Sequence, residues 1–67
     1  MLLPPRSAAV GRLIRELDLS GVSVAALVRD GQRRPDPPGD LLLETGDVLV
    51  LFGADLEVRK AEERLLE

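Results

Sequence analysis

The pattern of apolar residues is densest at Val48–Phe52, where five successive positions are aliphatic or aromatic. Such a run of β-branched and large side chains predicts a strand that is buried on both faces. Gly46 and Asp47 precede it and predict a sharp turn, because glycine tolerates positive φ and aspartate can bond nearby backbone. We therefore expect Val48–Phe52 to be the central strand of the core.

Helical spacing of apolar residues occurs twice. The first stretch, Ala8–Leu17, has apolar residues at i, i+3, i+4 and i+7, with Ser7 as the N-cap and a break at Asp18–Gly21. Gly11 disfavours this helix by about 1 kcal/mol, and we interpret it as a close approach to the sheet rather than as a functional residue. The second stretch follows Asp55, which is expected to cap it, and its charged outer face is expected to be solvated. Its apolar stripe comprises Leu56, Val58, Ala61, Leu65 and Leu66.

A β-hairpin is predicted between the two helical stretches. Val22–Val28 consists of small and β-branched residues with one serine, and Asp30-Gly31 is typical of a two-residue type I′ turn. A short return strand, Gln32–Arg34, and a proline-rich loop, Pro35–Asp40, follow. On a regular strand, one face carries Val22, Val24, Ala26 and Val28, and the other carries Ser23, Ala25, Leu27 and Arg29.

With Met1–Leu3 as a weak edge strand, the predicted order of elements is β-α-β-β-β-α. This order predicts a small α+β fold, with a sheet of three to four mainly antiparallel strands and two helices. A chain of 67 residues is expected to form one domain, residues 1–67.

The composition excludes several functions. There is no cysteine, histidine, tryptophan or tyrosine, so disulfides, thiolate metal sites and the usual general base are absent, and no activated nucleophile is evident. A net charge of −3 disfavours binding to nucleic acid. No apolar run is long enough to span a bilayer, and Met1–Arg6 lacks the charged and apolar regions of a signal peptide. We expect a cytoplasmic protein that is not an enzyme.

Two groups of charged residues are candidate sites. Four loop carboxylates could bind a hard cation, but their spacing matches no EF-hand pattern, and Asp47 is better explained as a cap of its own turn; these are Asp36, Asp40, Glu44 and Asp47. Arg29, Arg33 and Arg34 flank the hairpin and could hold a phosphate, although solvated surface charges are the favoured interpretation. Arg29 is the strongest single candidate, because it ends the first hairpin strand.

The segments Gly11–Leu19, Gly21–Gly31 and Leu43–Gly53, in this order and spacing, resemble the TrkA carboxy-terminal domain, also described as the C-terminal lobe of regulator-of-K⁺-conductance (RCK) domains. The resemblance implies a regulatory module of K⁺ or cation/proton transport systems, attached to a channel or transporter subunit or to a Rossmann-type lobe. It also implies homodimers that bind effectors such as cyclic di-AMP or divalent cations. The Rossmann lobe with its Gly-rich loop is not in this sequence, so NAD binding is not implied.

We therefore expect a ligand-sensing dimerisation domain; the alternative is a structural or protein-interaction domain without a small-molecule effector. The small size of the chain and its many aliphatic residues favour a homodimer. We expect Leu27, Leu19 and Leu41–Leu43 at the interface, with Arg29 from each copy meeting a symmetric effector in the two-fold cleft.

Overall fold

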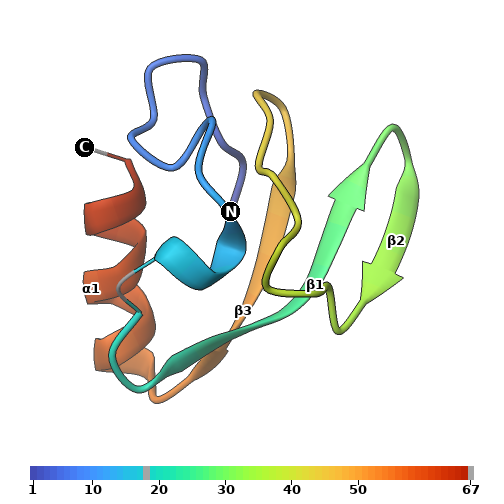
Figure 1. Cartoon of the computed structure of the whole chain (residues 1–67). Coiled ribbons are helices and arrows are strands. Elements are labelled where there is room, and N and C mark those ends of the chain that lie inside the picture. The colour runs from blue at the N-terminus through green and yellow to red at the C-terminus, as the bar shows by residue number, and fades with distance from the viewer. Residues whose placement is uncertain (18, 67) are drawn as a thin grey trace.

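The computed structural model describes residues 1–17 and 19–66, which form an antiparallel sheet with one α-helix packed against it (Figure 1). The elements in chain order are a 3₁₀ helix η1 (Ile14–Glu16), strands β1 (Val22–Arg29), β2 (Gln32–Pro35) and β3 (Val48–Gly53), and helix α1 (Asp55–Leu65). The predicted α+β class is confirmed. Three strands and one α-helix are present in the described part of the chain, which is slightly less than the sequence predicts.

The hairpin is confirmed in detail. Asp30 and Gly31 have φ angles of 52° and 75°, so both central residues of the turn adopt the positive φ that a type I′ turn needs. β1 lies in the middle of the sheet, because the strand order is β2-β1-β3. The prediction that Val48–Phe52 is the central strand is therefore wrong: β3 pairs with β1 on one side and, on the other, meets Leu2 in a single bridge at Val48.

A β-bulge divides β1 into two halves. Val24 pairs with Leu51 and Ala26 pairs with Val50, which leaves Ala25 as the extra residue. The bulge shifts the alternation of side chains, so Val22 and Val24 lie on the face that carries Leu51, whereas Ala26 and Val28 lie on the opposite face. The prediction of one continuous face for these four residues is wrong for this reason.

The core lies between α1, the sheet and the N-terminal segment. α1 covers one face of the sheet, which we call the core face. Leu27 of β1 and Leu49 of β3 face each other there at 0% and 1% exposure, since they are cross-strand partners. The buried cluster comprises Leu3, Ala9, Leu27, Leu43, Leu49 and Leu65.

The helix predicted over Ala8–Leu17 is wrong, because only Ile14–Glu16 is helical and its form is 3₁₀. Gly11 has a φ of +84° and no atoms near its Cβ position, so it serves a turn rather than a close approach to the sheet. The backbone of this segment bonds instead to the loop before β3. Gly11 N–H donates to the Leu43 carbonyl and Leu43 N–H to the Arg12 carbonyl, each at 2.9 Å. Val10, Ile14 and Leu17 still pack against the core, although no α-helix carries them.

The N-terminal residues extend the sheet only locally. The Met1 carbonyl accepts from Leu49 N–H at 2.8 Å, and Leu3 N–H donates to the Asp47 carbonyl at 2.9 Å. Asp18, which belongs to the predicted helix break, lies outside the described residues. Within the described residues, no helix has the length and apolar character needed to cross a membrane.

Candidate functional site: an uncovered sheet face beside an arginine cluster

The face of the sheet opposite α1 carries apolar side chains that the chain itself leaves exposed. We call this the open face. It follows from the strand register, because cross-strand partners point to the same side. Its members are Leu2, Ser23, Ala26, Val28, Arg33, Pro35, Val48, Val50 and Phe52.

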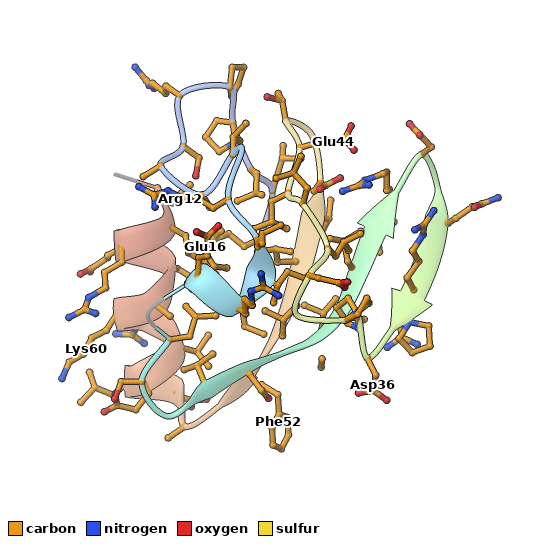
Figure 2. The ribbon with its side chains drawn as sticks, viewed as in Figure 1. Arg12, Glu16, Asp36, Glu44, Phe52 and Lys60 are labelled. Carbon is orange, nitrogen blue, oxygen red and sulfur yellow. The ribbon has the colours of Figure 1, made fainter. Side chains whose placement is uncertain are left out.

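The large apolar side chains that are exposed on the open face come from β3 and from Leu2 beside it. Phe52 is 73% exposed, Leu2 60% and Val50 38%, and Phe52 projects away from the ribbon in Figure 2. Val28 and Val48 are half-buried, and Ala26 is buried between its cross-strand neighbours Pro35 and Val50. The prediction that β3 is buried on both faces is therefore wrong. Apolar residues gathered in this way on a small domain typically mark an interaction surface.

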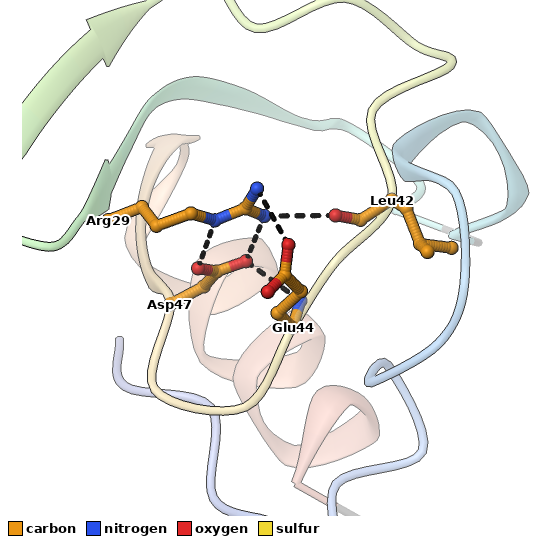
Figure 3. Close-up of polar contacts among 4 residues, drawn as sticks. All are labelled: Arg29, Leu42, Glu44 and Asp47. Carbon is orange, nitrogen blue, oxygen red and sulfur yellow. Dashed lines mark hydrogen bonds and ion pairs between the residues drawn. The ribbon is translucent and has the colours of Figure 1, made fainter.

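Arg29 lies at the end of β1 and points to the core-face side, where it meets a buried carboxylate (Figure 3). Its Nε donates to Asp47 Oδ1 at 2.8 Å and its Nη2 to Asp47 Oδ2 at 2.7 Å, which is a bidentate pair. Nη2 also donates to the Leu42 carbonyl at 2.9 Å, and Nη1 lies 2.9 Å from Glu44 Oε2. All three guanidinium nitrogens thus contact groups of the loop between β2 and β3.

Asp47 is 1% exposed, so its charge must be compensated within the protein. Besides the Arg29 pair, Asp47 Oδ2 accepts from Glu44 N–H at 2.8 Å, which confirms that Asp47 caps its own turn. The hydrogen bond from Arg29 lowers the pKa of the Asp47 carboxyl, with burial opposing it. The same hydrogen bond raises the pKa of Arg29 above its usual value. The pair therefore stays ionised and holds the hairpin to this loop.

The structure separates the three predicted effector-binding arginines. Arg33 pairs with Val28, so its side chain lies on the open face, whereas Arg34 pairs with Leu27 and lies on the core-face side. Arg34 is near enough to lower the pKa of Asp47 electrostatically, so Arg29 and Arg34 belong to one cluster and Arg33 does not. Both β2 arginines are exposed.

The loop carboxylates do not converge into a metal site. Across residues 1–17 and 19–66, no group of three or more acidic side chains is arranged to hold an ion. Glu44 and Asp47 meet at Arg29, whereas Asp36 and Asp40 are exposed elsewhere in the loop.

Leu27 was predicted at the dimer interface, and the structure shows this to be wrong because the side chain is fully buried in the core. The bulge at Ala25 is the cause of the missed site. It moves Ala26 and Val28 onto the open face, and no simple alternation of residues signals it. The only hint in the sequence is Ser23, a polar residue within an otherwise apolar run.

Comparison with known proteins identifies the family. The profile of the TrkA-C domain matches residues 1–66. The chain belongs to the TrkA-C domain family. The resemblance found in the sequence is thus confirmed over nearly the whole chain. No curated protein matches it.

Solved structures share the fold of this TrkA-C domain. The RCK_C domain dimer of S. agalactiae BusR in complex with c-di-AMP superposes with a TM-score of 0.84 at 19% identity, covering 97% of this chain and 90% of that one. An RCK domain with cda superposes with a TM-score of 0.82 at 21% identity, covering 97% of this chain and 91% of that one. The RCK C domain of the potassium transport protein KtrA in complex with c-di-AMP superposes with a TM-score of 0.75 at 28% identity, covering 82% of this chain and 68% of that one.

Proposed function

We propose that this TrkA-C domain is a cytoplasmic, non-enzymatic regulatory module of a K⁺ or cation/proton transport system, and that it acts by forming a homodimer that binds a small effector. Family membership supports a regulatory role. The BusR relative is an RCK_C dimer in complex with c-di-AMP, and the KtrA relative is also in complex with c-di-AMP. Cyclic di-AMP is therefore the first effector to test, with divalent cations and other nucleotides after it. A channel, a transporter subunit or a Rossmann-type lobe is the expected attachment.

The observation that carries the proposal is the open face. A 67-residue chain without disulfides cannot readily leave Leu2, Val50 and Phe52 in water, since they weaken solubility and contribute nothing to stability while exposed. A second copy placed on the same face covers these residues in both chains, because a two-fold interface is self-complementary. The interface in this proposal is therefore the open face rather than Leu27.

The effector contacts in this proposal come from the hairpin arginines Arg29, Arg33 and Arg34, each with a different part. Arg33 lies on the open face, so two copies would present two guanidinium groups to a symmetric, doubly charged effector. The Arg29 guanidinium donates to Asp47 of the same chain, and this pair fixes the end of the hairpin that carries Arg33. Arg34 would contribute electrostatic attraction from the core-face side.

Sedimentation velocity of the wild type and two matched variants tests the dimer. Phe52→Asp should yield monomers at tens of micromolar, because a carboxylate would be placed within an apolar interface. Leu56→Asp makes the same change at a 60%-exposed leucine of α1, away from the open face, and should leave the dimer intact. Equal sedimentation of Phe52→Asp and wild type would refute the open face as the interface.

Thermal denaturation with cyclic di-AMP tests the effector. A ligand at about 100 times its Kd stabilises the native state by about 2.7 kcal/mol, and Arg33→Gln should lose most of this gain. A dimer that responds to no effector would instead favour the alternative, a structural or protein-interaction domain.

A further inference from the structure

A hollow lies on the opposite side of the molecule from the open face. It has a volume of about 250 Å³ and lies between the N-terminal segment and the C-terminal half of α1. The N-terminal segment lines it with Ala8, Ala9, Arg12, Glu16 and Leu17, and α1 lines it with Arg64 and Leu65. Because α1 packs on the core face, this hollow is independent of the proposed dimer interface.

The floor of the hollow is apolar and fixed. Ala9 and Leu65 are 2% and 5% exposed and belong to the buried cluster. Ser7, also buried, links the two elements beneath the hollow, because its hydroxyl donates to the Leu65 carbonyl and accepts from Ala9 N–H at 3.2 Å. The small side chains of Ala8 and Ala9 leave the space that larger residues would fill.

The walls carry charges of both signs. Arg12 and Glu16 lie beside the C-terminal end of α1 in Figure 2, and Arg64 comes from α1 itself. Glu16 Oε1 accepts from Leu13 N–H at 2.8 Å, which fixes the carboxylate, while its second oxygen has no partner among the described residues. The Arg12 guanidinium has no hydrogen bond or ion pair with the described residues, and Arg64 already has an interaction of its own.

We propose that this hollow binds a free amino acid with an apolar side chain, such as leucine. The Arg12 guanidinium, supported by Arg64, suits the ligand's carboxylate, and the open oxygen of Glu16 suits its ammonium group. The apolar floor suits its side chain. The volume lies below the range of about 300–1,000 Å³ of sites for drug-sized ligands, so a cyclic dinucleotide would not be enclosed here.

A titration of the ¹⁵N-labelled chain with leucine, followed by amide chemical shifts, tests the proposal. The largest shifts should fall at Ala8, Ala9, Leu17 and Leu65. Three related compounds each remove one feature: 4-methylpentanoate lacks the ammonium group, leucinamide lacks the carboxylate, and glycine lacks the apolar side chain. Each should bind at least about fivefold more weakly than leucine, which is the loss expected for one partly exposed charge-assisted hydrogen bond or a small apolar contact.

Variants assign the two charged groups. Arg12→Gln should weaken leucine about fivefold and abolish its advantage over leucinamide. Glu16→Gln keeps an oxygen for Leu13 N–H but should abolish the advantage over 4-methylpentanoate. Lys60→Gln is the matched control, because Lys60 does not line the hollow and projects outward from α1 in Figure 2, and it should change nothing. Shifts elsewhere in the chain, or equal affinities for leucine and its three relatives, would overturn the proposal.

Discussion

Replacing Arg29 by methionine tests whether the arginine cluster holds the fold together. The substitution keeps the apolar stem of the side chain but leaves the 1%-exposed Asp47 carboxylate with one remaining hydrogen bond, from Glu44 N–H. Removing one partner of a buried ion pair costs about 3–5 kcal/mol. The Arg29 side chain is 18% exposed, so we expect the lower end, about 3 kcal/mol.

This loss is large for a domain of this size. At about 0.05–0.15 kcal/mol per residue, the whole chain has a free energy of unfolding of about 3–10 kcal/mol. The assay is urea denaturation followed by far-UV circular dichroism, because the chain has no tryptophan or tyrosine for fluorescence. If Arg29→Met does not fold in buffer, sucrose or another excluded osmolyte should restore it for measurement. Glu44→Gln is the control: Glu44 is 61% exposed, so its loss should cost less than about 1 kcal/mol.

The pH dependence makes the test specific to the ion pair. In the wild type, Arg29 lowers the pKa of Asp47 below its unfolded value of about 3.9. The stability from this pair is therefore fully present above that value and is lost as pH falls through the lower, folded pKa. In Arg29→Met, burial becomes the main influence and should raise the pKa of Asp47, so the variant's deficit should shrink on acidification toward about pH 4. A deficit below about 1 kcal/mol at neutral pH, or one that does not change with pH, would refute this account.

Two further substitutions test local features. Gly46→Ala should destabilise the fold by about 1–2 kcal/mol in urea denaturation, because Gly46 has a φ of +89°. The added methyl group meets no other atoms, so the loss reports backbone strain alone. Ser7→Ala should lower the free energy of unfolding by about 1–3 kcal/mol, since the buried Leu65 carbonyl and Ala9 N–H lose their shared partner. Amide exchange near the end of α1 should also accelerate, and unchanged exchange there would contradict this role.

Local signals in the sequence predict the elements whose structure is determined locally. The Asp30-Gly31 turn, the strand at Val48 and the C-terminal helix were all predicted, and the structure confirms them. In each case the turn residues or the apolar spacing fix the backbone without help from distant segments. The capping role of Asp47 belongs to the same class, because its partner Glu44 is three residues away. The predicted cap at Asp55 is wrong, because Ala54 is the N-cap and Asp55 lies in the first turn of α1.

The wrong predictions concern segments whose structure depends on contacts with residues far away in the sequence. The spacing of Val10, Ile14 and Leu17 places apolar residues toward a core equally well in an α-helix and in an irregular segment. The backbone of this region bonds to residues 24 to 32 positions away, for example Ile14 N–H to the Leu41 carbonyl, and periodicity carries no information about such pairs. The same holds for the Arg29–Asp47 pair, which was not predicted. The pair was missed because the two residues lie 18 positions apart in the sequence. The role of Arg29 as an effector ligand stays a prediction.

Because of the bulge at Ala25, substitutions in the two halves of β1 affect different faces of the sheet. Because the alternation is reset there, substitutions at Val22 and Val24 alter the packing against α1, whereas substitutions at Ala26 and Val28 alter what the opposite surface recognises. Related sequences could therefore change partner or ligand in the second half of β1 without repacking the first half. Deleting Ala25 would leave Val24 and Ala26 opposite the successive residues Leu51 and Val50, so the strand would become regular while each side chain keeps its present face.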